Sequence, residues 1–178
     1  MGATNWLYFV PYQADIKEAL QNLRADVFLR NDYYAPFTKE TLIKSLEEAL
    51  RNPERYNADA DLLAVWQQDL ARLKSLSEAD TDDVEEAIQE VLAVNSESGT
   101  HSILDIHSIS PTVGFGVAAP LSSQELHELF GTDKPTHQMI ESKSDEILSL
   151  RKRWEGAYII VYQNGKANEV AFAGYSGD

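Results

Sequence analysis

Two histidines and an aspartate stand close together near the middle of the chain, at His101, Asp105 and His107. Imidazole and carboxylate groups are ligands that zinc, manganese and iron accept, and such sites need three or four of them. If residues 101–110 form a strand, alternate side chains share one face, so these three would lie on the same side. The pattern therefore suggests a divalent metal site completed by ligands from elsewhere, such as His127 or the acidic helix that begins near Val84. A polar strand face or a buried Asp–His hydrogen bond would give the same pattern without a metal.

Two glycine-containing segments match known motifs in residue type but lack the helix that each motif requires after it. Residues 114–119 fit the Gly-x-Gly-x-x-Ala dinucleotide pattern, which requires a helix directly after it, whereas Pro120 follows here. Gly174-Tyr175-Ser176-Gly177 does not continue into a helix, as a nucleophile elbow must. We therefore predict no catalytic residue from either motif.

The chain is acidic, and the acid is concentrated in one region. Fifteen Lys and Arg stand against 29 Asp and Glu, for a net charge of −14. No Lys or Arg occurs between Lys74 and Lys134, a stretch that holds twelve acids. A face with one sign of charge favours a basic protein partner, although it is also typical of an ordinary solvated helix. The interaction residues that we predict are Asp82, Asp83, Glu86 and Glu90.

Composition excludes several classes of function. The negative charge repels nucleic acids and anionic membranes, and no apolar run is long enough for a membrane helix. The chain has no cysteine, so thiol nucleophiles, disulfides and thiolate zinc sites are absent. The first residues lack the pattern of a signal peptide, so we expect a cytoplasmic protein.

The apolar periodicity of the first half predicts one strand followed by four helices. The strand covers residues 5–12 and is apolar on both faces, which is typical of a strand that is central in its sheet or covered on both faces. The helices are expected at residues 15–31, 38–52, 59–76 and from Val84 onward. The segment 32–98 could form a helical insertion or subdomain within an otherwise single domain of residues 1–178.

The second half predicts strands at 101–110 and 113–119, then two helices and a hairpin. Ser122 and Glu125 form a capping box for the first helix, which Gly131 ends, and the second spans 135–156. Asn164-Gly165 favours a two-residue turn that pairs Gln163 with Lys166. The whole order is β-α-α-α-α-β-β-α-α-β-β. It predicts an α+β fold, an antiparallel or mixed sheet of about five strands with helices packed on it.

Several short segments resemble an uncharacterised family of small bacterial proteins. They are Gly2–Trp6, Tyr8–Tyr12, Gly99–Ile106, Leu129–Thr132, Arg153-Trp154-x-Gly156 and Ser176–Asp178. The resemblance does not extend to residues 32–98. It implies a bacterial cytoplasmic origin and assigns no activity or catalytic residue.

Three functions of different classes remain after these exclusions. A non-enzymatic protein-interaction or regulatory domain using the acidic central region agrees best with the charge and with the lack of a complete catalytic set. A metal-dependent hydrolase built around Asp105 and His107 is the first alternative. A small-ligand binding module, formed by the aromatic first strand and the Tyr158/Tyr162 face, is the second.

Overall fold

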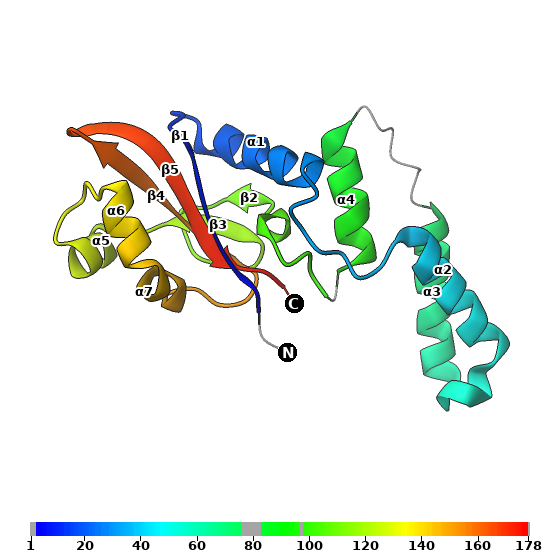
Figure 1. Ribbon diagram of the computed structural model, residues 1–178. Helices are drawn as coiled ribbons and strands as arrows, with labels where there is room; N and C mark the ends of the chain where they lie inside the picture. Colours follow the sequence, from blue (N-terminus) through cyan, green and yellow to red (C-terminus); the bar gives the residue numbers. More distant parts are fainter. Residues whose placement is uncertain (1–2, 76–82, 97, 178) are drawn as a thin grey trace. The chain divides into compact units, whose positions relative to one another are not determined.

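The computed structural model describes residues 3–75, 83–96 and 98–177, and it confirms the α+β prediction (Figure 1). The elements are β1 (Asn5–Pro11), α1 (Ile16–Leu29), α2 (Lys39–Arg51), η1 (Pro53–Tyr56), α3 (Ala60–Ser75), α4 (Val84–Val94), η2 (Ile103–Asp105), β2 (Ser108–Ile109), β3 (Val117–Pro120), α5 (Ser123–Phe130), α6 (His137–Ser142), α7 (Ser144–Ser149), β4 (Glu155–Gln163) and β5 (Lys166–Tyr175). Within the described ranges, no helix is both long and apolar enough to cross a membrane.

The chain divides into two compact units. One consists of residues 1–34 and 97–178, and the other of residues 35–96. The first contains the whole sheet, and the second contains α2, η1, α3 and α4. The second unit covers nearly the same residues as the predicted insertion, 32–98, but its independent folding stays a prediction.

The five strands form one mixed sheet in the order β1-β5-β4-β3-β2. β5 pairs antiparallel with β1 and β4, whereas β3 pairs parallel with β4 and β2. As a result β1, β2, β3 and β4 all begin near the end of the sheet at which β5 finishes. Figure 1 shows the start of β1 and the end of β5 side by side.

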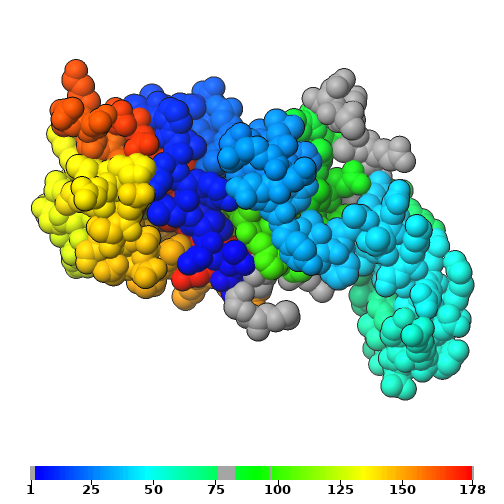
Figure 2. Space-filling view, in the orientation of Figure 1, coloured from blue at the N-terminus to red at the C-terminus, as the bar shows by residue number. Residues whose placement is uncertain are grey.

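One face of the sheet is covered by α5, α6 and α7. Alanines of β4 and β5 leave room there for larger side chains from the helices, including Phe130, Ile140 and Ile147. β1 adds Leu7 and Phe9 at the margin of this core. Figure 2 shows the atoms of β1, in dark blue, adjoining the yellow atoms of α6.

On the opposite face, a tryptophan lies across two glycines. The pairing register places Trp6, Gly174, Gly156 and Ala118 in one row across the sheet. A Cβ atom at Gly174 would lie 2.7 Å from the indole, and one at Gly156 would lie 3.2 Å from it. Both glycines are therefore needed for close approach of the buried indole.

The hairpin turn agrees with the prediction, but the register beyond it does not. Asn164 and Gly165 have φ of 51° and 77°, and Gln163 pairs with Lys166. Further along, Tyr162 pairs with Ala167 and Val161 with Glu169, so Asn168 is an extra, bulged residue. The carbonyl oxygen of Asn168 accepts a hydrogen bond from the amide of Tyr12 at 2.9 Å. The bulge moves every later pair by one residue, so Tyr158 lies opposite Phe172, where an uninterrupted register from Gln163 and Lys166 would place Ala171.

Two predicted elements are wrong in form. Residues 101–110 are not one strand: a 3₁₀ turn covers Ile103–Asp105, and only Ser108–Ile109 pairs as a strand. The helix expected over 135–156 is two short helices separated at Lys143, and Gly156 already belongs to β4.

Candidate functional site

Segments from five parts of the sequence meet at the end of the sheet where four strands begin. The amide of Ser176 donates to the carbonyl oxygen of Thr4 at 2.9 Å, and the amide of Gly116 donates to that of Trp154 at 2.7 Å. The amide of His107 donates to the carbonyl oxygen of Gly116 at 2.9 Å. Several of the segments that carry the bacterial resemblance therefore lie together here.

Asp105 is buried at this end, and its carboxylate holds two segments in place. Its side chain accepts hydrogen bonds from the amide and the hydroxyl of Thr100, at 2.9 and 2.8 Å. Its other oxygen accepts from the amide of Gly177 at 2.7 Å. Only 3% of the residue is exposed. These contacts give the carboxylate a structural role, joining the 99–105 loop to the segment after β5.

The two histidines predicted as metal ligands face other partners. Nδ1 of His101 is hydrogen bonded to the hydroxyl of Thr4 at 3.1 Å, and its ring packs edge-on against Tyr34. The His107 ring lies over Gly116, where a Cβ atom would overlap it. The shared strand face on which the metal prediction rested does not exist, because η2 interrupts it. Among the described residues, no group of three or more His, Asp or Glu side chains is arranged to hold a metal ion.

The backbone at this end adopts several left-handed conformations. Gly99, His101, Gly116 and Trp154 have φ between 53° and 68°. For non-glycine residues such angles persist only where the surroundings enforce them. At Trp154 the surroundings are visible: its indole packs directly on Gly177, and the neighbouring Arg153 donates to the Gly177 carbonyl oxygen.

An exposed aromatic surface lies beside this network. We call it the Phe115 surface and define it as His107, Val113, Phe115 and Trp154. Phe115 is 69% exposed and Val113 47%, and the rings of Phe115 and Trp154 are 5.0 Å apart between centroids. Phe115 and Trp154 are in ring contact, and Val113 is two positions from Phe115 in sequence. Exposed apolar side chains close to one another often mark contact sites.

The sequence around this surface is almost free of charge. A quarter of the chain is Asp, Glu, Lys or Arg, yet residues 98–124 contain only Asp105, which is buried. The charged residues next to Trp154 in sequence are Arg153, Lys152 and Glu155, and Glu155 accepts from the amide of Lys152 at 2.9 Å. Sequence reasoning missed this site, although the gap in charge was a signal that could have found it.

Two of the four acidic residues predicted as a contact surface, Asp83 and Glu90, have local roles in the other unit. Asp83 caps α4 by accepting from the amides of Glu85 and Glu86. Glu90 lies 3.7 Å from the ammonium group of Lys39. Glu86 is exposed, and Asp82 lies outside the described residues. Their role in binding a basic partner stays a prediction.

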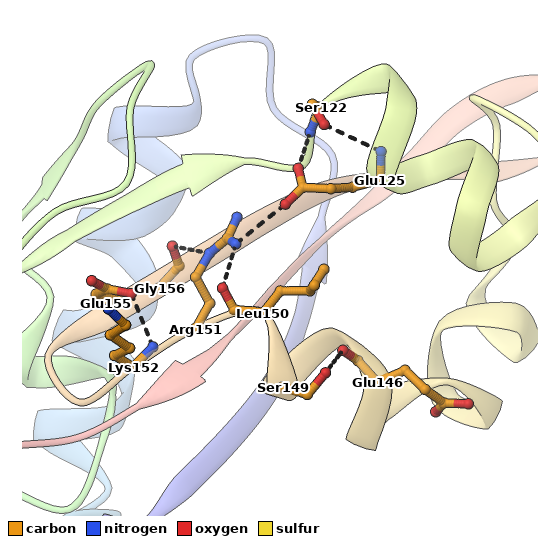
Figure 3. Close-up of polar contacts among 9 residues, drawn as sticks. All are labelled: Ser122, Glu125, Glu146, Ser149, Leu150, Arg151, Lys152, Glu155 and Gly156. Atoms are coloured by element: carbon orange, nitrogen blue, oxygen red, sulfur yellow. Dashed lines mark hydrogen bonds and ion pairs between the residues drawn. The ribbon is translucent and has the colours of Figure 1, made fainter.

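A buried arginine connects the start of α5 with β4 (Figure 3). The Arg151 side chain is 2% exposed; its Nε donates to the carbonyl oxygen of Gly156 at 3.2 Å, and its Nη1 lies 3.6 Å from Glu125. Glu125 also accepts from the amide of Ser122 at 2.6 Å, which completes the predicted capping box. Burial opposes ionisation of Glu125, but these hydrogen bonds and the arginine lower its pKa overall. Arg151 is thus a structural residue.

A third connection, at the surface, involves His137. Its ring stacks on Phe9 at 3.8 Å, and its Nδ1 is hydrogen bonded to Glu169 at 2.9 Å. Nε2, on the far side of the ring, lies 3.4 Å from Glu141. The hydrogen bond to Glu169 raises the pKa of His137, and the charge of both carboxylates adds to this effect.

The tyrosines named for a small-ligand site have different neighbours. Tyr8, Phe172 and Tyr158 form one row across the sheet, and burial raises the pKa of both tyrosines. The Tyr162 ring instead lies 5.7 Å from the ammonium group of Lys134.

No protein-family model, no curated protein and no solved structure matches this chain. The resemblance to a bacterial family therefore stays a prediction, and the geometry described above is what bears on function.

Proposed function

We propose that this chain is a non-enzymatic protein-interaction domain whose contact site is the Phe115 surface. The observation that carries the proposal is an exposed, uncharged aromatic cluster on a chain of net charge −14. Interface centres are depleted in charge and enriched in aromatic residues, as this surface is.

The rigid backbone beneath the surface supports the same proposal. Phe115 directly precedes Gly116, whose carbonyl oxygen accepts from the amide of His107 and whose amide donates to the carbonyl oxygen of Trp154. A side chain held in this way loses little freedom when a partner covers it, so more of its burial appears as affinity. The Asp105 carboxylate is already engaged by Thr100 and Gly177, which argues against a catalytic role for it.

Photocrosslinking inside cells tests the proposal. A photoreactive phenylalanine analogue is placed at Phe115 and, as a matched control, at Leu29, which is 67% exposed but lies beside the Arg30–Asp26 ion pair. We expect covalent protein adducts at position 115 and none above background at position 29. Adducts of equal yield at both positions, or none at 115, would contradict the proposal.

The acidic region of the second unit supports a second contact with a basic protein. The charge asymmetry of the sequence is the observation that favours it. Glu86→Gln combined with Glu90→Gln should weaken such binding, and the loss should shrink as salt screens the charges. Binding that is unchanged by both substitutions would exclude this contact.

The metal-dependent hydrolase stays an untested alternative with less support from the geometry. Elemental analysis of protein purified without a histidine tag decides it. Near-stoichiometric zinc, manganese or iron that is lost in His107→Ala would favour it over the interaction domain. Metal content that His107→Ala leaves unchanged would exclude a site at these residues.

A further inference from the structure

We infer that the partner at the Phe115 surface is a second copy of this chain, which forms a symmetric dimer through that surface. The inference rests on the proposed function, because it names the partner of the same site. It begins with charge: two copies each carry −14, so most approaches bring carboxylates together and are repelled.

The Phe115 surface is a region where two copies can meet without that repulsion. Its four side chains carry no carboxylate, and the sequence that builds most of it, residues 98–124, has only the buried Asp105. The carboxylate next to Trp154 in sequence, Glu155, already accepts a hydrogen bond from the amide of Lys152. The exposed cations next to Trp154 in sequence, Lys152 and Arg153, would repel a basic partner, which would be attracted instead to the acidic parts of the chain.

The Phe115 surface is also suited to packing against the same surface of a second copy. In a twofold interface the same patch faces its own copy, so a projecting group must find a receptive one nearby. Phe115 projects, while the Trp154 indole beside it is only partly exposed and rests on Gly177. Phe115 of one copy can therefore pack on the aromatic pair of the other, and the reverse contact follows by symmetry.

Such a dimer is expected to be weak and favoured by salt. Four side chains bury much less area than a stable dimer interface, so association should appear only at high protein concentration. Added salt screens the repulsion between the two acidic bodies and leaves the apolar contact intact. Association through oppositely charged groups weakens as salt is added. Association that strengthens with salt therefore distinguishes this apolar contact from a charged one.

Sedimentation velocity of the full chain tests it, at protein concentrations from micromolar to hundreds of micromolar. The measurements are made at about 0.05 M and about 0.5 M sodium chloride, where the screening length differs several-fold. We expect the average mass to rise with concentration, and to rise more at high salt. Phe115→Ser should remain monomeric, and Leu29→Ser should behave as the unchanged chain. Equal melting temperatures of the two variants would show that folding is not the cause.

The other outcomes overturn the inference and separate it from the proposed function. A monomer under all conditions refutes the dimer; the proposed function then stands if crosslinks at position 115 join a different protein, and fails if there are none. Association that persists in Phe115→Ser, or that weakens with salt, places self-contact elsewhere and also refutes the inference. A crosslinked product at position 115 with twice the mass of the chain supports both.

Discussion

Asp105 and Glu169 both join parts of the chain that are far apart in sequence, but in opposite surroundings. Asp105 is buried and accepts from Thr100 and Gly177, whereas Glu169 is near the surface and holds the exposed ring of His137. The Arg151–Glu125 pair is intermediate, with a buried cation and a half-buried carboxylate.

The difference shows how burial decides the contribution of a polar contact to the free energy of unfolding. A buried donor that loses its acceptor bears its whole desolvation cost, whereas an exposed group forms a hydrogen bond with water instead. The cost of removing each connection should therefore fall in the order Asp105, Arg151–Glu125, His137. Substitutions at these positions can break that order or make it quantitative.

Asp105→Ala should have the largest effect. It leaves the amides of Thr100 and Gly177 without their buried acceptor; each such donor costs about 1–3 kcal/mol, so we expect a loss of about 2–6 kcal/mol in the free energy of unfolding. Urea denaturation measures it. Asp105→Asn keeps an oxygen for Thr100 but turns an amide toward Gly177, so it should cost less and should speed hydrogen exchange at the Gly177 amide. A loss in Asp105→Ala smaller than that in His137→Gln would break the comparison.

Gly99→Ala sharpens the account of the same buried site. Gly99 has φ of 68°, and a Cβ atom there would lie 2.7 Å from the Asp105 carboxylate. Gly131→Ala is the matched control, since Gly131 has φ of 70° and a Cβ atom there would meet nothing within 4 Å. We expect about 1 kcal/mol for Gly131→Ala from the backbone alone, and at least about 1 kcal/mol more for Gly99→Ala from crowding. Equal losses in thermal unfolding would show that the Asp105 site is not tightly packed.

Arg151→Met should be intermediate. It removes the donors to Gly156 and Glu125 but keeps an apolar side chain of similar length, so we expect a loss of about 2 kcal/mol. Glu125→Gln should cost less at neutral pH. Because the folded pKa of Glu125 is lowered, its ionisation stabilises the fold above its ordinary pKa, and that contribution disappears as pH falls through the folded pKa. The difference between the unchanged chain and Glu125→Gln should therefore shrink in acid; a constant difference would exclude the ionised carboxylate as its source.

Local sequence signals predicted the elements that depend on local contacts. The Ser122 capping box and the Asn164-Gly165 turn are decided by residues within a few positions of each other. The segment 101–110 was predicted wrongly because its conformation depends on Asp105 bonding to Gly177, which is 72 residues away. No periodicity in the segment itself could indicate that partner.

The same limit explains the errors around the hairpin and the candidate site. The bulge at Asn168 is tied to Tyr12, just beyond β1, a contact made only once the sheet is assembled. The pairing of Phe115 with Trp154 likewise requires the parallel alignment of β3 with β4. The histidines that predicted a metal site lie at the same end of the sheet as the Phe115 surface, and the metal site itself stays a prediction.

Of the three connections, the one made by His137 should contribute least to stability, so His137→Gln should have the smallest effect. It is also the only one of the three whose contribution decreases as pH rises. The neighbouring carboxylates raise the pKa of His137 above its ordinary value of 6.5, so the protonated ring stabilises the folded state. That contribution is complete below pH 6.5, provided that Glu169 and Glu141 stay ionised, and it is lost as pH rises through the folded pKa. Exposed pairs contribute up to about 1 kcal/mol, so the difference between the unchanged chain and His137→Gln should stay below that near pH 6 and decrease by about pH 9.

Glu169→Gln provides the control, because it removes the main partner while leaving the imidazole stacked on Phe9. Urea denaturation across this pH range measures both, and a difference that grows with pH would mean that neutral His137, not its cation, makes the stabilising contact.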